Sequence, residues 1–224
     1  MSLKSPIVVG ASILSLASLS GIGYAIWRFS QPSSVSTSTE IAPASSTTSA
    51  DVFRERLSCT ITMAEVDTSN PSLSVYFAAN DPSRIVGQLD NHSFVTVGME
   101  QNGWFLIQKP LTGWIPKQQT QSSCNEKVEM VRFDAKGGTA AIADRFVGSG
   151  SHLYRLPLTE GATLTLSNTR GILPFVLAPE GELLLNPQES QINWTGRVPR
   201  TGVYTLEMLS QHKGYHYAFT ISVK

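Results

Sequence analysis

Residues 73–115 read LSVYFAANDPSRIVGQLDNHSFVTVGMEQNGWFLIQKPLTGWI, and their pattern is the strongest indication of the fold. Apolar and polar side chains alternate in residues 73–77, and the runs that follow are rich in β-branched and aromatic residues. Asn-Asp-Pro-Ser, Asp-Asn-His and Gln-Asn-Gly separate these runs, which is typical of short β-strands joined by tight turns. Five or so strands between residues 59 and 124 predict a small closed β-barrel.

The same stretch is similar to the bacterial SH3-like domain. The likeness rests on an I-x-G-x-L motif at residues 85–89 and on two Gly-Trp pairs, at 103–104 and 113–114. It covers about residues 59–124. The resemblance implies a binding module without chemistry of its own, which in several relatives recognises cell-wall peptides or partner proteins.

A candidate ligand groove follows from this resemblance: Tyr76, Phe77 and Trp104 would line it, with Arg84 on the adjacent loop. Exposed aromatic rings suit stacking on a peptide or a sugar. The usual L-N-V-R-x-G-P start of the family is replaced here by LSVYFAA, so the Arg and Gly of that loop are absent. Taken one by one, Trp104 and Trp114 are also typical core residues and Arg84 a typical solvated loop charge.

Residues 127–224 again have a β pattern, and no convincing helical window interrupts it. Seven to eight candidate strands predict a β-sandwich. YRLPLTEGATLTLS, a central FVLAPEG and the corner TGVYTLEM make this region similar to the pre-peptidase C-terminal type of sandwich. Periplasmic inhibitors of goose-type lysozyme have a similar sandwich and corner, so inhibition of a wall-cleaving enzyme is a second functional reading.

The N-terminus is apolar. No charged residue occurs in residues 6–27, and Lys4 and Arg28 flank them. A helix of about 21 residues spans roughly 30 Å, the thickness of one bilayer core. We therefore expect a membrane anchor in residues 1–29, crossing at 7–27. A cleaved signal peptide is the alternative, but the apolar run continues past its candidate cleavage site at 18–20.

Residues 30–50 are dominated by Ser and Thr and contain no aromatic residue, which is typical of a flexible tether. The first β-domain is expected at 51–126 and the second at 127–224. For residues 51–57 the pattern leaves a helical turn and an entry strand equally open.

Cys59 and Cys124 are the two cysteines of the chain, and they bracket the expected barrel. This placement favours a disulfide over a zinc site, because structural zinc needs four ligands. Two unpaired thiols in a reducing compartment are the alternative. A disulfide would place most of the chain outside the cytoplasm. The expected location is the bacterial inner membrane, single-pass, with the C-terminal domains in the periplasm or outside the cell.

Charge and motifs exclude several functions. Seventeen basic residues balance seventeen acidic ones, so the chain lacks the excess of positive charge that is typical of nucleic-acid-binding proteins. His212 and His216 have i, i+4 spacing but lie in a β context, which argues against a helical metal pair. The run at 149–152, Ser-Gly-Ser-His, lacks the strand-turn-helix elbow of a catalytic serine. We expect no catalytic residues, no metal and no cofactor.

The sequence therefore predicts a mainly β protein with an N-terminal transmembrane helix, an SH3-like barrel and a sandwich. The expected function is that of a membrane-anchored extracytoplasmic module which binds peptidoglycan peptide or an envelope protein and is not an enzyme. The alternative is a regulator of a lysozyme-type cell-wall hydrolase, acting through the sandwich.

Overall fold

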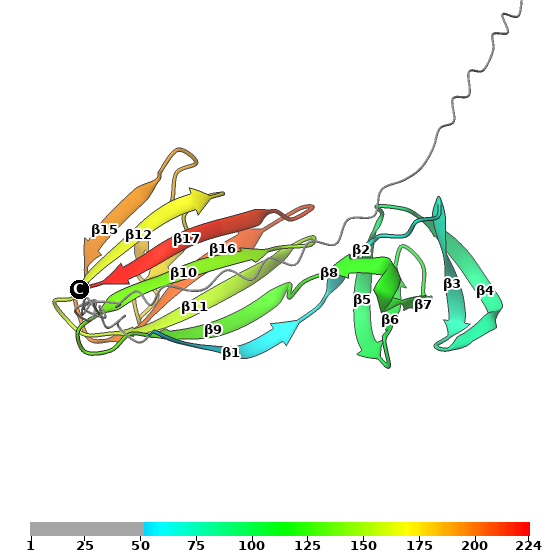
Figure 1. Cartoon of the computed structure of the whole chain (residues 1–224), viewed down its shortest axis with the longest axis horizontal. Helices are drawn as coiled ribbons and strands as arrows, with labels where there is room; N and C mark the ends of the chain where they lie inside the picture. Colours follow the sequence, from blue (N-terminus) through cyan, green and yellow to red (C-terminus); the bar gives the residue numbers. More distant parts are fainter. Residues whose placement is uncertain (1–51) are drawn as a thin grey trace, which may run out of the picture. The chain divides into compact units, whose positions relative to one another are not determined.

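The computed structural model describes residues 52–224, which consist of seventeen strands, β1 to β17, and one short 3-10 turn (Figure 1). The expectation of a mainly β protein is confirmed for these residues. The predicted anchor at 7–27 and the tether at 30–50 lie outside them. Within residues 52–224, no helix has the length and apolar character needed to cross a membrane.

One antiparallel sheet has seven strands in the order β4-β3-β7-β6-β5-β2-β8. Its strands are β2 (Met63–Val66), β3 (Ser72–Ala78), β4 (Asp81–Asp90), β5 (Phe94–Gln101), β6 (Trp104–Lys109), β7 (Gly113–Pro116) and β8 (Thr120–Ser122). We call this sheet, with the 3-10 turn at Lys117–Gln119, the seven-stranded unit. The five or so strands predicted from the sequence correspond to β3 to β7, whereas β2 and β8, at one edge of the sheet, are additional.

The core of the seven-stranded unit follows from strand alternation. Val95 and Val97 on β5, and Phe105 and Ile107 on β6, are almost fully buried, and the residues between them are more exposed. Asn102 has a φ of 49° and Gly103 a φ of 79°, as a two-residue type I′ turn between two strands requires.

Two further sheets pack face to face around a single large core and form the sandwich. The first has the order β1-β9-β11-β16-β13-β14, and the second has the order β10-β17-β12-β15. The strands are β1 (Phe53–Thr60), β9 (Glu126–Arg132), β10 (Gly138–Arg145), β11 (Gly150–Leu158), β12 (Thr163–Arg170), β13 (Phe175–Leu177), β14 (Leu183–Leu185), β15 (Asn193–Arg197), β16 (Gly202–Ser210) and β17 (His216–Val223).

The sandwich corner at Thr201-Gly202-Val203-Tyr204 is a tyrosine corner. The buried Tyr204 hydroxyl donates a hydrogen bond to the Arg200 carbonyl oxygen at 2.8 Å. Thr201 Oγ1 accepts a hydrogen bond from the Glu160 amide. Corners of this kind are typical of Greek-key sandwiches, so these residues stabilise the fold.

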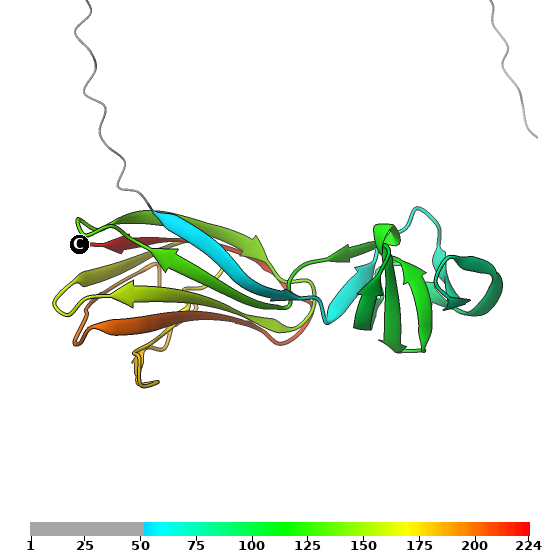
Figure 2. The same ribbon diagram turned by 90° about the horizontal axis from the view of Figure 1, so that it is seen from below.

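β1 resolves the question left open at residues 51–57, because a strand begins at Phe53. It pairs antiparallel with β9, the first strand after the seven-stranded unit, and Figure 2 shows the two strands side by side. The seven-stranded unit is thus inserted in the chain between two adjacent strands of the sandwich. The range 51–126 that we expected for the barrel therefore includes β1, a strand of the sandwich. With β1, the sandwich has ten strands.

Candidate functional site

A row of apolar side chains crosses the outer surface of the seven-stranded unit. Cross-strand pairing places Tyr76 beside Trp114, Trp114 beside Leu106, and Leu106 beside Met99, on four consecutive strands. Val75, Phe105 and Ile115, the sequence neighbours of Tyr76, Leu106 and Trp114, fill the core, so these three side chains face outward. Met99 joins them because the strand register shifts between Val97 and Met99. Met99 is 48% exposed and the other three are half-buried. We call these four residues the aromatic row.

Trp104 extends the aromatic row. Its ring meets the ring of Tyr76 edge to face, with centroids 5.7 Å apart. Its indole nitrogen donates a hydrogen bond of 2.7 Å to Asn80 Oδ1. A Trp with one half-exposed face and a fixed N–H orientation is a rigid apolar anchor of the kind that dominates protein interfaces.

Close packing of glycine brings β3 and β7 together under this surface. A Cβ on Gly113 would lie 2.6 Å from Val75 Cγ1 and 2.8 Å from the Tyr76 carbonyl oxygen. Only glycine therefore allows Trp114, its neighbour, to lie beside Tyr76.

Phe77 and Arg84, the other two residues of the predicted groove, form a separate pair. The Arg84 guanidinium lies 4.1 Å from the centroid of the Phe77 ring, a cation–π contact on the β3–β4 hairpin. Phe77 is 57% exposed. The structure thus brings Tyr76 together with Trp104, and Phe77 together with Arg84; the ligand-binding role of all four remains a prediction. Sequence reasoning missed Leu106 and Met99, which only the strand register reveals.

The expected disulfide is present. Cys59 on β1 and Cys124 just before β9 are bonded, with Cα atoms 5.1 Å apart. The bond joins the two chain segments that lead into and out of the seven-stranded unit. Disulfides persist in oxidising compartments, so this bond indicates an extracytoplasmic location for the described residues.

Asn125, next to Cys124, is a fully buried hydrogen-bonding hub. Its Oδ1 accepts hydrogen bonds from the amides of Thr62 and Met63, at 2.9 and 3.0 Å. Its Nδ2 donates to the carbonyl oxygens of Val147 and Ser149, at 2.7 and 2.9 Å. All four hydrogen-bonding positions of the amide are therefore satisfied. One side chain connects the entry to β2 with the loop before β11.

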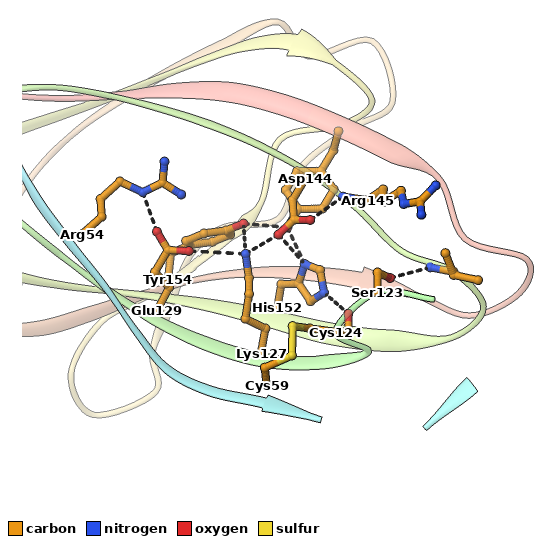
Figure 3. A network of polar contacts seen from close by, with 12 residues as sticks. Arg54, Cys59, Ser123, Cys124, Lys127, Glu129, Asp144, Arg145, His152 and Tyr154 are labelled. Atoms are coloured by element: carbon orange, nitrogen blue, oxygen red, sulfur yellow. Dashed lines mark hydrogen bonds and ion pairs between the residues drawn. A yellow bond between two sulfur atoms is a disulfide. The ribbon is translucent and has the colours of Figure 1, made fainter. Parts of the chain in front are cut away.

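Inside the sandwich, close to the disulfide, is a network of polar side chains that sequence reasoning did not identify (Figure 3). The Lys127 side chain is 3% exposed, and its Nζ contacts Asp144 Oδ2 at 2.5 Å and Glu129 Oε2 at 3.4 Å. The same ammonium donates to the Tyr154 hydroxyl at 2.8 Å. Arg54 on β1 pairs with Glu129 at 2.5 Å. Each buried charge thus has an opposite charge beside it, as burial requires.

His152 ends a chain of hydrogen bonds that begins at this ammonium. Tyr154 and Tyr217 share a hydroxyl–hydroxyl bond of 2.7 Å, and Tyr217 OH lies 2.5 Å from His152 Nδ1. His152 Nε2 lies 2.7 Å from the Cys124 carbonyl oxygen. A carbonyl oxygen only accepts, so Nε2 carries the proton, and a neutral His152 accepts at Nδ1 from Tyr217.

The titration behaviour agrees with this assignment. Burial lowers the pKa of His152, and the nearby positive Lys127 lowers it further. Burial alone would lower the pKa of Lys127 and raise that of Asp144. Tyr154, followed by the hydrogen bond and charge of Asp144, nevertheless raises the pKa of Lys127. Hydrogen bonds from Lys127 and from the Arg145 amide, together with the charge of Lys127, lower the pKa of Asp144. The network therefore holds an ionised Lys–Asp pair beside a neutral histidine.

The aromatic row lies on the surface of the seven-stranded unit, whereas the polar network is buried in the sandwich. Among the described residues, no group of three or more His, Cys, Asp or Glu side chains could hold a metal ion. His152, which ended the Ser-Gly-Ser-His run at 149–152, lies in β11 and points into the core, away from any surface nucleophile. His216 begins β17 and pairs with Arg145, so it shares no helix face with His212.

No family model matches the chain, and no curated protein matches it. The solved structures similar to this chain include PliG from Aeromonas hydrophila, a periplasmic inhibitor of g-type lysozyme, with 20% identity over 44% of this chain and 97% of that chain. They also include PliG from Salmonella Typhimurium, with 20% identity over 42% of this chain and 97% of that chain. A mutant of the Escherichia coli PliG is similar too, with 17% identity over 45% of this chain and 99% of that chain.

The TM-score is 0.34 for each of these structures. Periplasmic inhibitors of goose-type lysozyme are also the proteins that the sequence of residues 127–224 resembles. At such a TM-score the likeness supports no inference about the function of this chain.

Proposed function

We propose that this chain is a non-catalytic binding protein which recognises a cell-wall peptide or an envelope protein through the seven-stranded unit. The observation that carries the proposal is the aromatic row with Trp104 beside it. Trp and Tyr are the side chains that most often dominate binding energy at interfaces, because they bury a large apolar area at low entropic cost. Aromatic rings grouped on an outer sheet surface are costly to leave in water without a partner.

The rest of the chain fits display outside the cytoplasm. The disulfide between Cys59 and Cys124 suits the periplasm or the cell exterior. In this proposal, residues 7–27 anchor the protein in the inner membrane and residues 30–50 tether it. A tether of about 21 flexible residues has a typical reach of roughly 25 Å.

The test uses residues 47–224, a compact unit that holds both sheets of the sandwich and the seven-stranded unit. Cutting at 126/127 would separate β1 from β9, so shorter fragments are unsuitable. The fragment is sedimented with purified peptidoglycan and, in parallel, used as bait in envelope extract. Met99→Gln removes one exposed member of the aromatic row and should weaken the interaction, whereas Phe53→Ala removes an exposed aromatic ring on β1 and should not.

A second candidate function is inhibition of a wall-cleaving hydrolase of the lysozyme type by the sandwich. The resemblance of residues 127–224 to such inhibitors supports it, and so do exposed apolar side chains on β1 and β16, where Leu57 is 46%, Val203 43% and Leu209 37% exposed. Residues 47–224 would then slow a goose-type lysozyme at micromolar concentration. Unchanged lysozyme rates would rule this candidate out.

A further inference from the structure

The outer face of the second sandwich sheet carries small hydroxyl side chains in register. Strand pairing aligns one row across all four strands, made of Thr139, Ser222, Thr165 and Thr195. The next row contains Ala141, Thr220, Ser167 and Asn193. We call these two rows the hydroxyl face. The four strands lie side by side in Figure 1.

Two further rows close one end of this face with basic side chains. Ala143, Ala218 and Arg170 form the third row, and Arg145 and His216 form the fourth. These five residues, together with Asp144 and Tyr217, line a shallow cavity of about 300 Å³. We call it the basic notch. Its lining includes two alanines, two arginines and a histidine.

The charge of the basic notch is uncompensated. Asp144 is its only acidic lining residue, and its carboxylate already accepts from Lys127 Nζ and from the Arg145 backbone amide. No ion pair among the described residues involves Arg145 or Arg170. Arg145 makes one neutral contact instead, from Nη1 to Gln121 Oε1 at 3.2 Å. The buried Lys127 thus neutralises the carboxylate that would otherwise oppose an anion here.

The hydroxyl face itself carries no charge of either sign. Its eight side chains are all Thr, Ser, Ala or Asn, as the two rows show. Thr139 Oγ1 lies 3.3 Å from Ser222 Oγ, and the hydroxyls of Thr165 and Thr195 are 3.1 Å apart. Hydroxyls both donate and accept, so these rows suit a ligand that also carries many hydroxyls. These side chains are short, so an extended chain can approach the sheet closely.

We propose that the basic notch and the hydroxyl face together bind an acidic glycan. A carboxylate of the polymer sits in the notch between the guanidinium groups of Arg145 and Arg170, which match carboxylate geometry. Sugar hydroxyls of the same chain exchange hydrogen bonds with Thr220 and Ser167 in the adjoining row. The site lies on the sandwich, so it is separate from the aromatic row. A protein that fails to bind glycan can therefore still bind a wall peptide or an envelope protein through the aromatic row.

The test compares polygalacturonate, with a carboxylate on each sugar, with its methyl-esterified form, which has the same backbone without the charge. Binding to residues 47–224 is measured by calorimetry at two salt concentrations. We expect binding of the acidic polymer alone, weakened by salt because the charges are exposed. The variant Arg145→Gln/Arg170→Gln should lose affinity by on the order of tenfold or more. Arg155→Gln, an exposed arginine on an outward position of β11, is the matched control and should keep wild-type affinity.

A second variant tests the glycan itself. Thr220→Val/Ser167→Ala keeps the notch and removes two hydroxyls, and we expect it to weaken binding severalfold while polygalacturonate still binds better than its ester. Equal binding of the esterified polymer, no binding of either polymer, or an equal loss in Arg155→Gln would overturn the proposal. Unchanged affinity in Thr220→Val/Ser167→Ala would overturn the assignment to a glycan.

Discussion

Asn125→Ala offers the sharpest test of how the seven-stranded unit is held to the sandwich. The substitution removes four hydrogen bonds of 2.7 to 3.0 Å from a side chain with no solvent exposure. At about 1 kcal/mol for each bond, the loss is about 4 kcal/mol of unfolding free energy, and more where a backbone group stays buried without a partner. For a domain of ordinary stability this is a large fraction of the total.

The assay is urea unfolding of residues 47–224, followed by tryptophan fluorescence and by circular dichroism. Trp104 and Trp114 report on the seven-stranded unit, and Trp194 on the sandwich. The exposed Asn70 provides the matched control, so Asn70→Ala should stay within about 0.5 kcal/mol of wild type.

Asn125→Asp refines the same test. The carboxylate can still accept from the amides of Thr62 and Met63, but its other oxygen faces the carbonyl oxygens of Val147 and Ser149. It should therefore destabilise at least as much as alanine at neutral pH. If Asn125→Ala lowers the unfolding free energy by less than about 1 kcal/mol, the four buried hydrogen bonds of Asn125 do not stabilise the fold as argued here.

Three further predictions concern the same end of the sandwich. Replacing both cysteines (Cys59→Ser/Cys124→Ser) opens a loop with a sequence separation of 65. In the chain-entropy model this should lower the unfolding free energy by about 4 kcal/mol, as measured by urea unfolding without reductant. The pKa of His152 is lowered in the folded protein, so the unfolded chain binds more protons than the folded one below about pH 6.5. The unfolding free energy should therefore fall as the pH drops through this value, by at most about 1.4 kcal/mol per pH unit for this one group. His152→Gln should flatten that slope. Gly150→Ala should destabilise by more than 1 kcal/mol in the same urea assay, since its Cβ would lie 2.1 Å from the Asn125 carbonyl oxygen, and a smaller effect would contradict the close approach.

Local patterns explain why much of the fold could be predicted. Tight turns such as Asn102-Gly103 join neighbouring strands, and the alternation at Val95 and Val97 marks which face is buried. The pairing of β1 with β9 could not be found in this way, because the seven-stranded unit separates the two strands in the chain. The cysteine pair indicated the closeness of these segments without indicating the sheet they share.

The buried network escaped prediction for a different reason. In β9, Lys127 and Glu129 face the core, whereas Val128 and Met130 face outward, the reverse of the usual assignment of polar residues to solvent. Only the positions of Asp144 and Arg54 on other strands make this burial acceptable. Such compensation between distant residues is invisible to a local pattern.

The resemblance named Tyr76, a member of the aromatic row, and Trp104, which lies beside the row, as groove residues. Leu106 and Met99 join this surface only through the register of β5, β6 and β7. Residues two strands apart share a row because of hydrogen-bond pairing, which sequence spacing alone does not give.

Residues 47–224 are sedimented with purified peptidoglycan, and used in parallel for capture from envelope extract, as wild type, Met99→Gln, Trp104→Ala and Phe53→Ala. Binding through the aromatic row and Trp104 predicts retention by the wall, or capture of a single envelope protein, for wild type and Phe53→Ala, and a clear loss for Met99→Gln and Trp104→Ala. Equal retention and capture by all four proteins, or by none, would contradict it.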